Sequence, residues 1–220
     1  MSAPRREVVH ADALAWMDAN PAEAGTSVIT SLPDVSELPL LGFDGWRGWF
    51  VGAARRVIRW IPEDGVAIFF QSDVLHRGIW VDKGYLVMRA AEDAAAAIVF
   101  HRIVCRHPPG TLTQGRASYS HLICVARTPR PPRRPSADVL PTAGHMTWSK
   151  AMGVDACRAA CAYLRDETHT RTVADPFCGR GTVLAVANEH GFDARGVDLS
   201  ARRCRAAKSL TVAPVERRRP

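Results

Sequence analysis

Long apolar runs are missing from the 220-residue sequence, and this absence removes one class of protein. A helix needs about 18 or more consecutive apolar residues to span a bilayer, so we expect no membrane contact. The opening residues MSAPRREVVHADALAWM carry charges but no apolar core segment, so we also expect no secretory signal. These absences favour a cytoplasmic protein.

The six cysteines include no CxxC pair, the spacing typical of zinc and redox sites. Cys157 and Cys161 lie four residues apart on a predicted helix, but no further ligand follows at a recognised spacing. His101 and His107 lie near Cys105, yet strand alternation gives them no common site. We therefore expect no metal ion, and reduced thiols that are mostly buried.

The composition is that of an ordinary globular protein, with 47% hydrophobic and 23% charged residues. A chain of this length can bury a full core, so a single domain over residues 1–220 is the simplest interpretation. The formal net charge is +7 and the sequence pI is about 9.5. This excess favours a polyanionic partner such as nucleic acid, although the charge can also serve solubility alone.

Hydrophobic periodicity predicts strands and helices in alternation. We expect strands over residues 7–11, 26–32, 65–72, 97–105, 119–127, 170–177 and 194–200. We expect helices over 12–19, over 44–61 with Asp44 as cap, over 80–96, over 149–167 with Ser149 as cap, and over 181–191 and 201–210. Residues 128–147 form a basic, proline-rich loop and 211–220 a frayed tail.

This alternation predicts the α/β class, as a doubly wound sheet of seven mostly parallel strands. The strands over 97–105 and 119–127 adjoin without a helix, as in a hairpin, so one strand should run antiparallel. Aromatic and aliphatic residues recur at helical spacing between Trp46 and Ile61, and we interpret that stripe as core packing against the sheet.

A glycine-bearing turn follows the strand over 170–177 and precedes a helix. Gly179 and Gly181 let the backbone approach a ligand at the carboxyl end of that strand, where open α/β sheets bind ligands. Asp198 lies 17 residues after Gly181, at the end of the next strand, where its carboxylate can bind ribose hydroxyls. Leu184 occupies the third glycine position of a dinucleotide fingerprint, so no pyrophosphate signature is present.

The stretch DPFCGRGT (175–182) resembles the S-adenosylmethionine motif of methyltransferases that modify the amino group of adenine or cytosine. The resemblance implies that Asp198 binds the ribose of this cofactor. The segment VVHADALAWM is similar to the one that reaches the cofactor's adenine, here through Asp12. The resemblance implies further cofactor contacts from Asp175, Phe177, Gly179, Gly181 and Thr182.

In one permuted class of this family the catalytic motif comes first and the cofactor motif near the C-terminus, as it does here. The resemblance extends from about residue 7 to residue 208 and implies a circularly permuted Rossmann-like methyltransferase fold. Entering the sheet at the third strand gives the strand order that this fold requires. The segments 100–106, 119–127 and 145–153 are similar to the family's strand pair and to the stretch before its cofactor motif.

The family's catalytic tetrapeptide is Asp, Asn or Ser, then Pro-Pro, then Tyr or Phe, whereas this chain has Ser31-Leu32-Pro33-Asp34. Ser31 keeps a polar acceptor for the amine hydrogens, and the carbonyl of Leu32 can supply the second. Pro33 keeps some of the turn's stiffness. Asp34 cannot stack on a flipped base; it either accepts a hydrogen bond or proton from the target, or serves only as a turn residue.

The loop over 128–147 is too short to read a duplex in detail, so the sequence favours RNA (tRNA or rRNA) over DNA as substrate. Solvated loop charge explains the arginines of this part of the chain nearly as well as phosphate binding does. The candidate phosphate contacts are Arg102, Arg106, Arg116, Arg130, Arg133 and Arg134.

The leading hypothesis is therefore an S-adenosylmethionine-dependent N-methyltransferase that acts on a nucleobase amine in nucleic acid. Alternatives are a DNA adenine or cytosine amino-methyltransferase, methylation of a small molecule or protein side chain by the same fold, and an inactive cofactor-binding scaffold for nucleic acid. The target base and the oligomeric state stay open.

Overall fold

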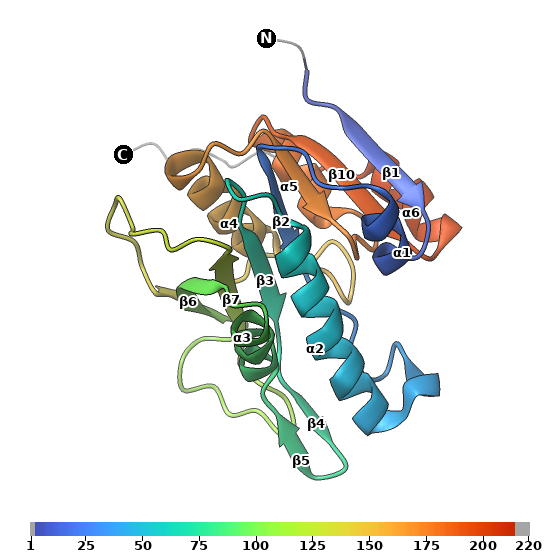
Figure 1. The fold of residues 1–220 in the computed structure, drawn as a ribbon. Coiled ribbons are helices and arrows are strands. Elements are labelled where there is room, and N and C mark those ends of the chain that lie inside the picture. The colour runs from blue at the N-terminus through green and yellow to red at the C-terminus, as the bar shows by residue number, and fades with distance from the viewer. Residues whose placement is uncertain (1–2, 214–220) are drawn as a thin grey trace.

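A computed structural model describes residues 3–213. Its centre is an eight-stranded sheet with the order β1-β10-β9-β2-β3-β7-β6-β8 (Figure 1). The strands are β1 (Arg6–His10), β2 (Thr26–Thr30), β3 (Ala67–Gln71), β6 (Ala97–Cys105), β7 (Tyr119–Ala126), β8 (Val139–Leu140), β9 (Thr172–Asp175) and β10 (Asp193–Asp198). Only β7 runs antiparallel to its neighbours in this sheet, which confirms the predicted mostly parallel α/β architecture. The eighth strand is the two-residue β8, inside the expected loop.

Helices cover both faces of the sheet, as expected for a doubly wound fold (Figure 1). The helices are α1 (Ala13–Ala19), α2 (Gly42–Trp60), α3 (Lys83–Asp93), α4 (Val154–Glu167), α5 (Thr182–Glu189) and α6 (Ala201–Ser209), with a short 3-10 helix η1 (Pro39–Leu41). Successive strand residues point to opposite faces, so Val28 enters the core under α1, α2 and α3, and Ile29 enters the core under α4, α5 and α6. The central strands are therefore apolar on both faces.

The last two strands of the chain lie inside the sheet rather than at its edge. β9 pairs with β2, and β10 pairs with both β9 and β1, all in parallel. The glycine turn that follows β9 is thereby placed at the centre of the sheet although it comes late in the sequence. The ends of β1, β2, β9 and β10 consequently meet at one edge, where loops can form a site.

The expected helix over 80–96 is wrong at its start. Residues before it form a small two-stranded sheet of β4 (Val74–His76) and β5 (Ile79–Val81), and α3 begins only at Lys83 with Asp82 as its N-cap. Arg77 and Gly78 both have positive φ, the backbone of a tight hairpin turn. The apolar residues 79–81 therefore belong to a strand and not to the helical face.

Two expected helix caps are also wrong. The N-cap of α4 is Gly153, and Ser149 lies in the loop before it. A Cβ at residue 153 would lie 2.0 Å from the carbonyl oxygen of Ala143, so this position requires glycine. The N-cap of α2 is Leu41, and Asp44 lies inside the first turn, where its charge still suits the helix dipole.

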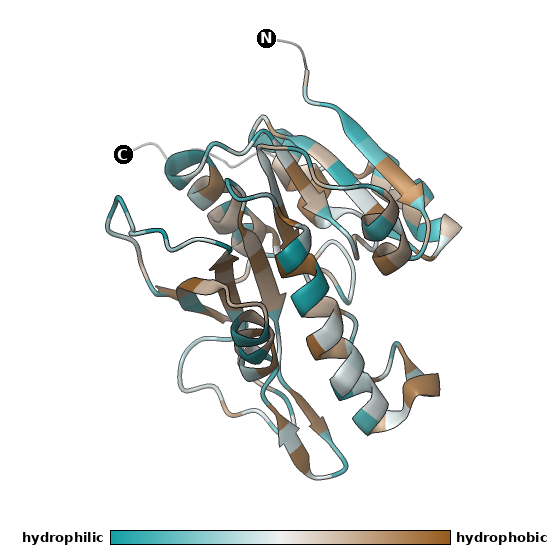
Figure 2. Ribbon diagram, viewed as in Figure 1, coloured by the Kyte–Doolittle hydropathy of each residue, from teal (hydrophilic) through white to brown (hydrophobic). Residues whose placement is uncertain are grey.

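Apolar surface is not confined to the core. Figure 2 shows hydrophobic residues on the central strands and also on η1 and the β4–β5 hairpin at the lower end of the molecule. The exposed apolar side chains there are Leu40, Leu41, Leu75, Ile79 and Trp80. All six cysteines are buried and free, as expected.

The two remaining expectations concern the membrane and the tail. No helix within residues 3–213 has the length and apolar character needed to cross a bilayer. Of the tail expected over 211–220, residues 214–220 lie outside the described part. Val212 packs against the core, and the carbonyl of Ala213 accepts a hydrogen bond from Arg158.

Candidate functional site

A cavity of about 420 Å³ opens at the carboxyl ends of β1, β2, β9 and β10. Its volume is within the range of small-molecule sites, roughly 300–1,000 Å³. Nine of the residues singled out from the sequence line it, although they come from both ends of the chain. These residues are Asp12, Ser31, Leu32, Pro33, Asp175, Phe177, Gly179, Thr182 and Asp198. We call this space the first cavity.

The glycine turn forms one wall of the first cavity. Gly179 and Gly181 have φ values of 56° and 86°, in the left-handed region that favours glycine. A Cβ on Gly179 would lie 2.6 Å from the ring of Trp148, which packs over the turn. Gly181 does not line the cavity; a Cβ there would lie 2.8 Å from the Cα of Ala207 in α6. The first glycine therefore opens the site, and the second lets two helices approach each other.

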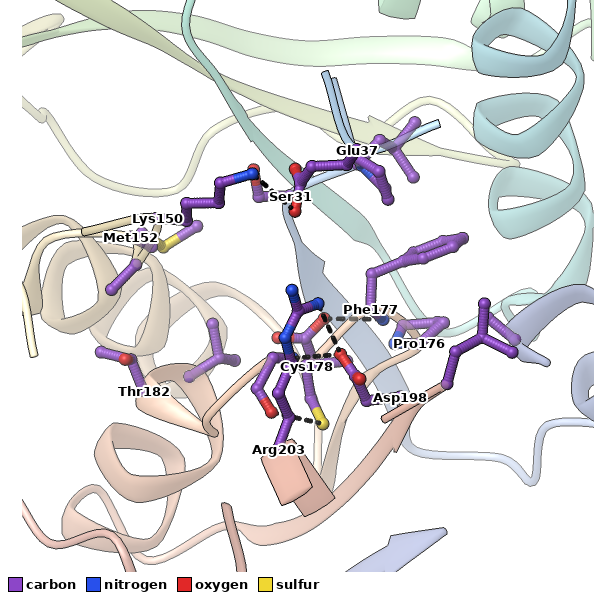
Figure 3. A pocket seen from close by; sticks show the side chains of 18 of the residues that line it. Ser31, Glu37, Lys150, Met152, Pro176, Phe177, Cys178, Thr182, Asp198 and Arg203 are labelled. Carbon is purple, nitrogen blue, oxygen red and sulfur yellow. Dashed lines mark hydrogen bonds and ion pairs between the residues drawn. The ribbon is translucent and has the colours of Figure 1, made fainter. Parts of the chain in front are cut away.

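Asp198 is held in a fixed orientation at the end of β10. Its carboxylate accepts hydrogen bonds from the backbone N–H groups of Gly179 (3.1 Å) and Ser200 (2.7 Å). Arg203 approaches the same carboxylate at 3.7 Å (Figure 3). The side chain is 8% exposed and faces the cavity, so the remaining lone pairs can accept from a ligand hydroxyl.

Asp175, the last residue of β9, is the most perturbed carboxyl group of the site. Burial raises its pKa to about 7, and nearby Asp198 acts in the same direction. Hydrogen bonds from the Thr30 hydroxyl (2.7 Å) and the Phe177 N–H (3.2 Å) offset only part of that effect. A cationic ligand in the cavity would favour the ionised carboxylate.

The rest of the wall combines a helix cap with aromatic rings. Asp12 caps α1 by accepting from the backbone N–H of Ala15 at 2.9 Å, and it lines the cavity from the end of β1. Trp49 lies edge-on to Phe177, with ring centroids 6.0 Å apart. One aromatic residue of the stripe in α2 thus reaches the cavity, whereas Trp46 of the same stripe is fully buried in the core.

The tetrapeptide crosses from the first cavity into a neighbouring space. Ser31 and Leu32 line both, while Asp34 lines only the neighbouring one. The carbonyl of Pro33 accepts from the indole N–H of Trp46 at 3.1 Å, which fixes the turn. Asp34 accepts from the backbone N–H (2.8 Å) and the hydroxyl (2.6 Å) of Ser36, so it acts at least as a turn residue.

Asp34 nevertheless keeps its charge. Burial raises its pKa, but the hydrogen bonds from Ser36 and the positive charges of Lys83 and Lys150 outweigh burial and hold the pKa below its usual range. An ionised Asp34 is an acceptor and not a donor. It is therefore suited to accept a hydrogen bond from a ligand in the neighbouring space.

That neighbouring space, the second cavity, has a volume of about 370 Å³ and was not anticipated from the sequence. Lys150 and Glu37, 3.2 Å apart as an ion pair, line both cavities beside Ser31 (Figure 3). Its own lining is strongly charged. The charged residues found only in the second cavity are Asp34, Asp73, Lys83, Arg106 and Arg116.

The six predicted phosphate contacts are not brought together. Arg106 and Arg116 line the second cavity. Arg102 lies over the ring of Phe100 at 4.0 Å and donates to Ser136. The other three belong to the loop over 128–147: Arg130 donates to the carbonyl of Glu63 just before β3, the backbone of Arg133 donates to Glu167 at the end of α4, and Arg134 is exposed. These contacts place the arginine-rich first part of that loop, residues 130–133, at the amino ends of the strands, whereas Ala143 and Met146 near its end line the second cavity.

One group of metal-ligating side chains occurs among residues 3–213. Asp73, Asp82 and His121 each place one ligand atom within 4.8 Å of the others. Asp73 already accepts from His121 (3.0 Å) and from the backbone N–H of Lys83 (2.9 Å), and Asp82 caps α3. These hydrogen bonds give the group a structural role at the start of α3.

The fold is shared with solved structures, one of which is described as a DNA methyltransferase. A protein of Thermus thermophilus, described as a candidate DNA modification methylase and bound to S-adenosyl-L-methionine, has a TM-score of 0.70 at 19% identity over 93% of each chain. The PvuII DNA methyltransferase, specific for cytosine N4, has a TM-score of 0.73 at 13% identity over 95% of this chain and 88% of its own. The M1.HpyAVI–SAM complex has a TM-score of 0.59 at 14% identity over 92% and 97%. The chain matches no protein-family model and no curated protein by sequence.

Proposed function

We propose that this protein is an S-adenosylmethionine-dependent methyltransferase that acts on the exocyclic amine of a nucleobase, with DNA as the favoured substrate. The observation that carries the proposal is the first cavity, because residues from β1, β2, β9 and β10 converge there in a fold shared with DNA methyltransferases. The position of β9 and β10 between β1 and β2 supports the permuted order of motifs that the resemblance implies.

The residues of the first cavity fit this cofactor. Asp198 would bind the ribose hydroxyls and Asp12 the adenine amine, since both present carboxylate oxygens to the cavity. Asp175 and the start of α5 at Thr182 would hold the methionine end, where the buried carboxyl group suits a positively charged ligand. When bound, the cofactor supplies an electrophilic methyl group. Its positive charge is the feature that the acidic lining favours.

Ser31 and the carbonyl of Leu32 would orient the acceptor amine between the two cavities. An exocyclic amine is a poor nucleophile because its lone pair is delocalised into the ring. Two hydrogen-bond acceptors that fix the amine hydrogens favour the tetrahedral nitrogen that attacks a methyl group. Ser31 is the residue placed for this role, since it lines both cavities and its hydroxyl has no partner among residues 3–213.

DNA is favoured over RNA by two of the structural neighbours, one described as a DNA methyltransferase and the other as a candidate DNA modification methylase. The expectation that RNA is preferred finds no support in them. The arginines of the loop over 128–147, on which that expectation partly rested, make their contacts away from both cavities, with Arg130 donating to Glu63 and the backbone of Arg133 to Glu167. Arg106 and Arg116, at the second cavity, are the retained candidates for phosphate contact.

The test is methyl transfer from labelled S-adenosylmethionine to three separate acceptors, namely unmethylated duplex DNA, tRNA and rRNA, followed by identification of the methylated nucleoside. We expect label in DNA, on cytosine N4 or adenine N6. Label in an RNA fraction would reassign the substrate, and cofactor binding without transfer to any acceptor would favour the inactive scaffold.

Ser31→Ala should lower the rate of transfer by about 10²-fold, the typical loss on removing one polar group that acts in the transition state. Cofactor affinity should be unchanged. Ser209→Ala, an exposed serine at the end of α6, is the matched control. Undiminished transfer by Ser31→Ala would remove Ser31 from the mechanism.

A further inference from the structure

Lys83 is a buried cation that the role of the first cavity leaves unexplained. Its residue is 5% exposed and lines the second cavity. Its ammonium makes no hydrogen bond and no ion pair within residues 3–213, and it is not among the side-chain nitrogens that are closed off from solvent, so it is accessible from the cavity. A largely desolvated charge without a protein partner favours a ligand that accepts a hydrogen bond from it.

The backbone around Lys83 is held firmly. Lys83 is the first residue of α3, and its N–H donates to Asp73 at 2.9 Å. Asp73 also accepts from His121 (3.0 Å) and from the hydroxyl of Tyr119 (3.3 Å). Gly84 is required beside it, because a Cβ there would lie 2.8 Å from the His121 ring. A hydrogen-bond network centred on Asp73 thus fixes the backbone from which the Lys83 side chain extends, and it connects the end of β3, β7 and the start of α3.

The charges around Lys83 restrict what the second cavity can hold. Burial lowers the pKa of Lys83, and the nearby carboxylates of Asp34, Glu37 and Asp73 act in the opposite direction. Arg106, Arg116 and Lys150 line the same space, so four cations face three carboxylates, which leaves no excess of negative charge for an alkylammonium and only one surplus positive charge for a phosphate. A neutral group that carries both hydrogen-bond donors and an acceptor suits the mixture.

Amino-substituted nucleobases have this chemistry. An exocyclic amine supplies the donors, and a ring nitrogen or carbonyl oxygen of the same base supplies the acceptor. Ser31 and Leu32 line both cavities, so an amine placed at Ser31 leaves the body of its ring in the second cavity, which Lys83 also lines. Arg106 and Arg116 of the same lining can then meet the flanking phosphates.

We propose that Lys83 is a specificity-determining residue for the acceptor, whose ammonium donates a hydrogen bond to the uncharged ring nitrogen or carbonyl oxygen of the base that is methylated. This inference rests on the proposed function and deepens it. A cation at this position also distinguishes a nucleobase from a protonated aliphatic amine, which the same charge would repel.

Steady-state methyl transfer to unmethylated duplex DNA of mixed sequence tests the role of Lys83. Lys83→Met should raise the KM for DNA by about tenfold or more, the typical loss of a hydrogen bond to a charged group. The affinity for S-adenosylmethionine should stay unchanged, because Lys83 does not line the first cavity. Lys83→Gln keeps an N–H donor and should recover part of the loss, and Lys208→Met on the exposed surface of α6 is the control.

Thermal unfolding separates this role from a structural one. Lys83→Met removes a largely desolvated charge that has no protein partner, so its Tm should equal or exceed that of the wild type. A lower Tm together with an unchanged KM for DNA would assign Lys83 to the fold and overturn the inference. If the wild type itself transfers no methyl group to DNA or RNA, the proposed function fails first and this inference fails with it.

Discussion

The pH dependence of cofactor binding should be set by Asp175. Its pKa of about 7 is about three units above the value of 3.8 for an exposed aspartate, and each unit corresponds to about 1.4 kcal/mol. Ionising Asp175 in the free protein therefore costs about 4 kcal/mol more than ionising an exposed aspartate. A positively charged cofactor favours the ionised form, so binding should release a proton from Asp175 at pH values below about 7.

The sign and size of the effect follow from this linkage. If the bound state restores an ordinary pKa, the affinity for S-adenosylmethionine should rise about tenfold per pH unit between about pH 5 and pH 7, and then level off. Calorimetry over that range, in two buffers with different ionisation enthalpies, measures both the Kd and the proton released. Asp175→Asn should remove the dependence, and the exposed Asp166→Asn should keep it. Identical profiles for the wild type and Asp175→Asn would refute the reasoning.

The same group affects the stability of the free protein. Because the pKa of Asp175 is raised in the folded state, its contribution to stability is fully present below about pH 4 and is lost as the pH rises through about 7. Asp175→Asn should therefore be more stable than the wild type at pH 8, as measured by Tm. A lower Tm at that pH would contradict the buried, protonated state.

Two further predictions concern the glycine turn and its carboxylate. Gly181→Ala should lower the free energy of unfolding by roughly 1–3 kcal/mol in a urea titration, because residue 181 has a positive φ and a Cβ there would lie 2.8 Å from Ala207. The control Gly52→Ala has open space around it and should not destabilise the protein. Equal stabilities of the two variants would contradict the strain assigned to residue 181. Asp198→Asn keeps only one acceptor oxygen, which the N–H groups of Gly179 and Ser200 would share, so fewer lone pairs are left for the cofactor's ribose hydroxyls. The cofactor affinity, measured by fluorescence titration, should therefore fall about tenfold or more. An unchanged Kd would exclude the proposal that Asp198 binds the ribose.

The sequence predicted the lining of the first cavity better than that of the second. Asp175, Gly179 and Asp198 belong to one contiguous strand–turn–helix–strand unit, so a local pattern was enough to identify them. Asp12 and Ser31 follow other strands, and only the family resemblance connected them with that unit. Their common place at the first cavity comes from the sheet order, which brings β1 and β2 to either side of β9 and β10.

The second cavity had no such signal. Lys83 lay inside a stretch expected to be one helix, and a lysine there is normally solvated, so nothing in the pattern predicted its burial. Asp73 lies between β3 and a hairpin that was not anticipated. Trp148 packs over Gly179 from a loop, where no hydrophobic periodicity indicates which side chains face the site. Such residues are placed by long-range packing, which spacing along the chain does not encode.

The pairing of β1 with β10 has a consequence for synthesis on the ribosome. β1 leaves the exit tunnel long before β10, the strand that it pairs with residue for residue from Arg6↔Ala194 to His10↔Asp198. The nascent chain must therefore keep β1 without this partner until β10 has been made. Contacts so distant in sequence also slow folding, so chaperone access during elongation should matter more for this protein than for one whose first strands pair with each other.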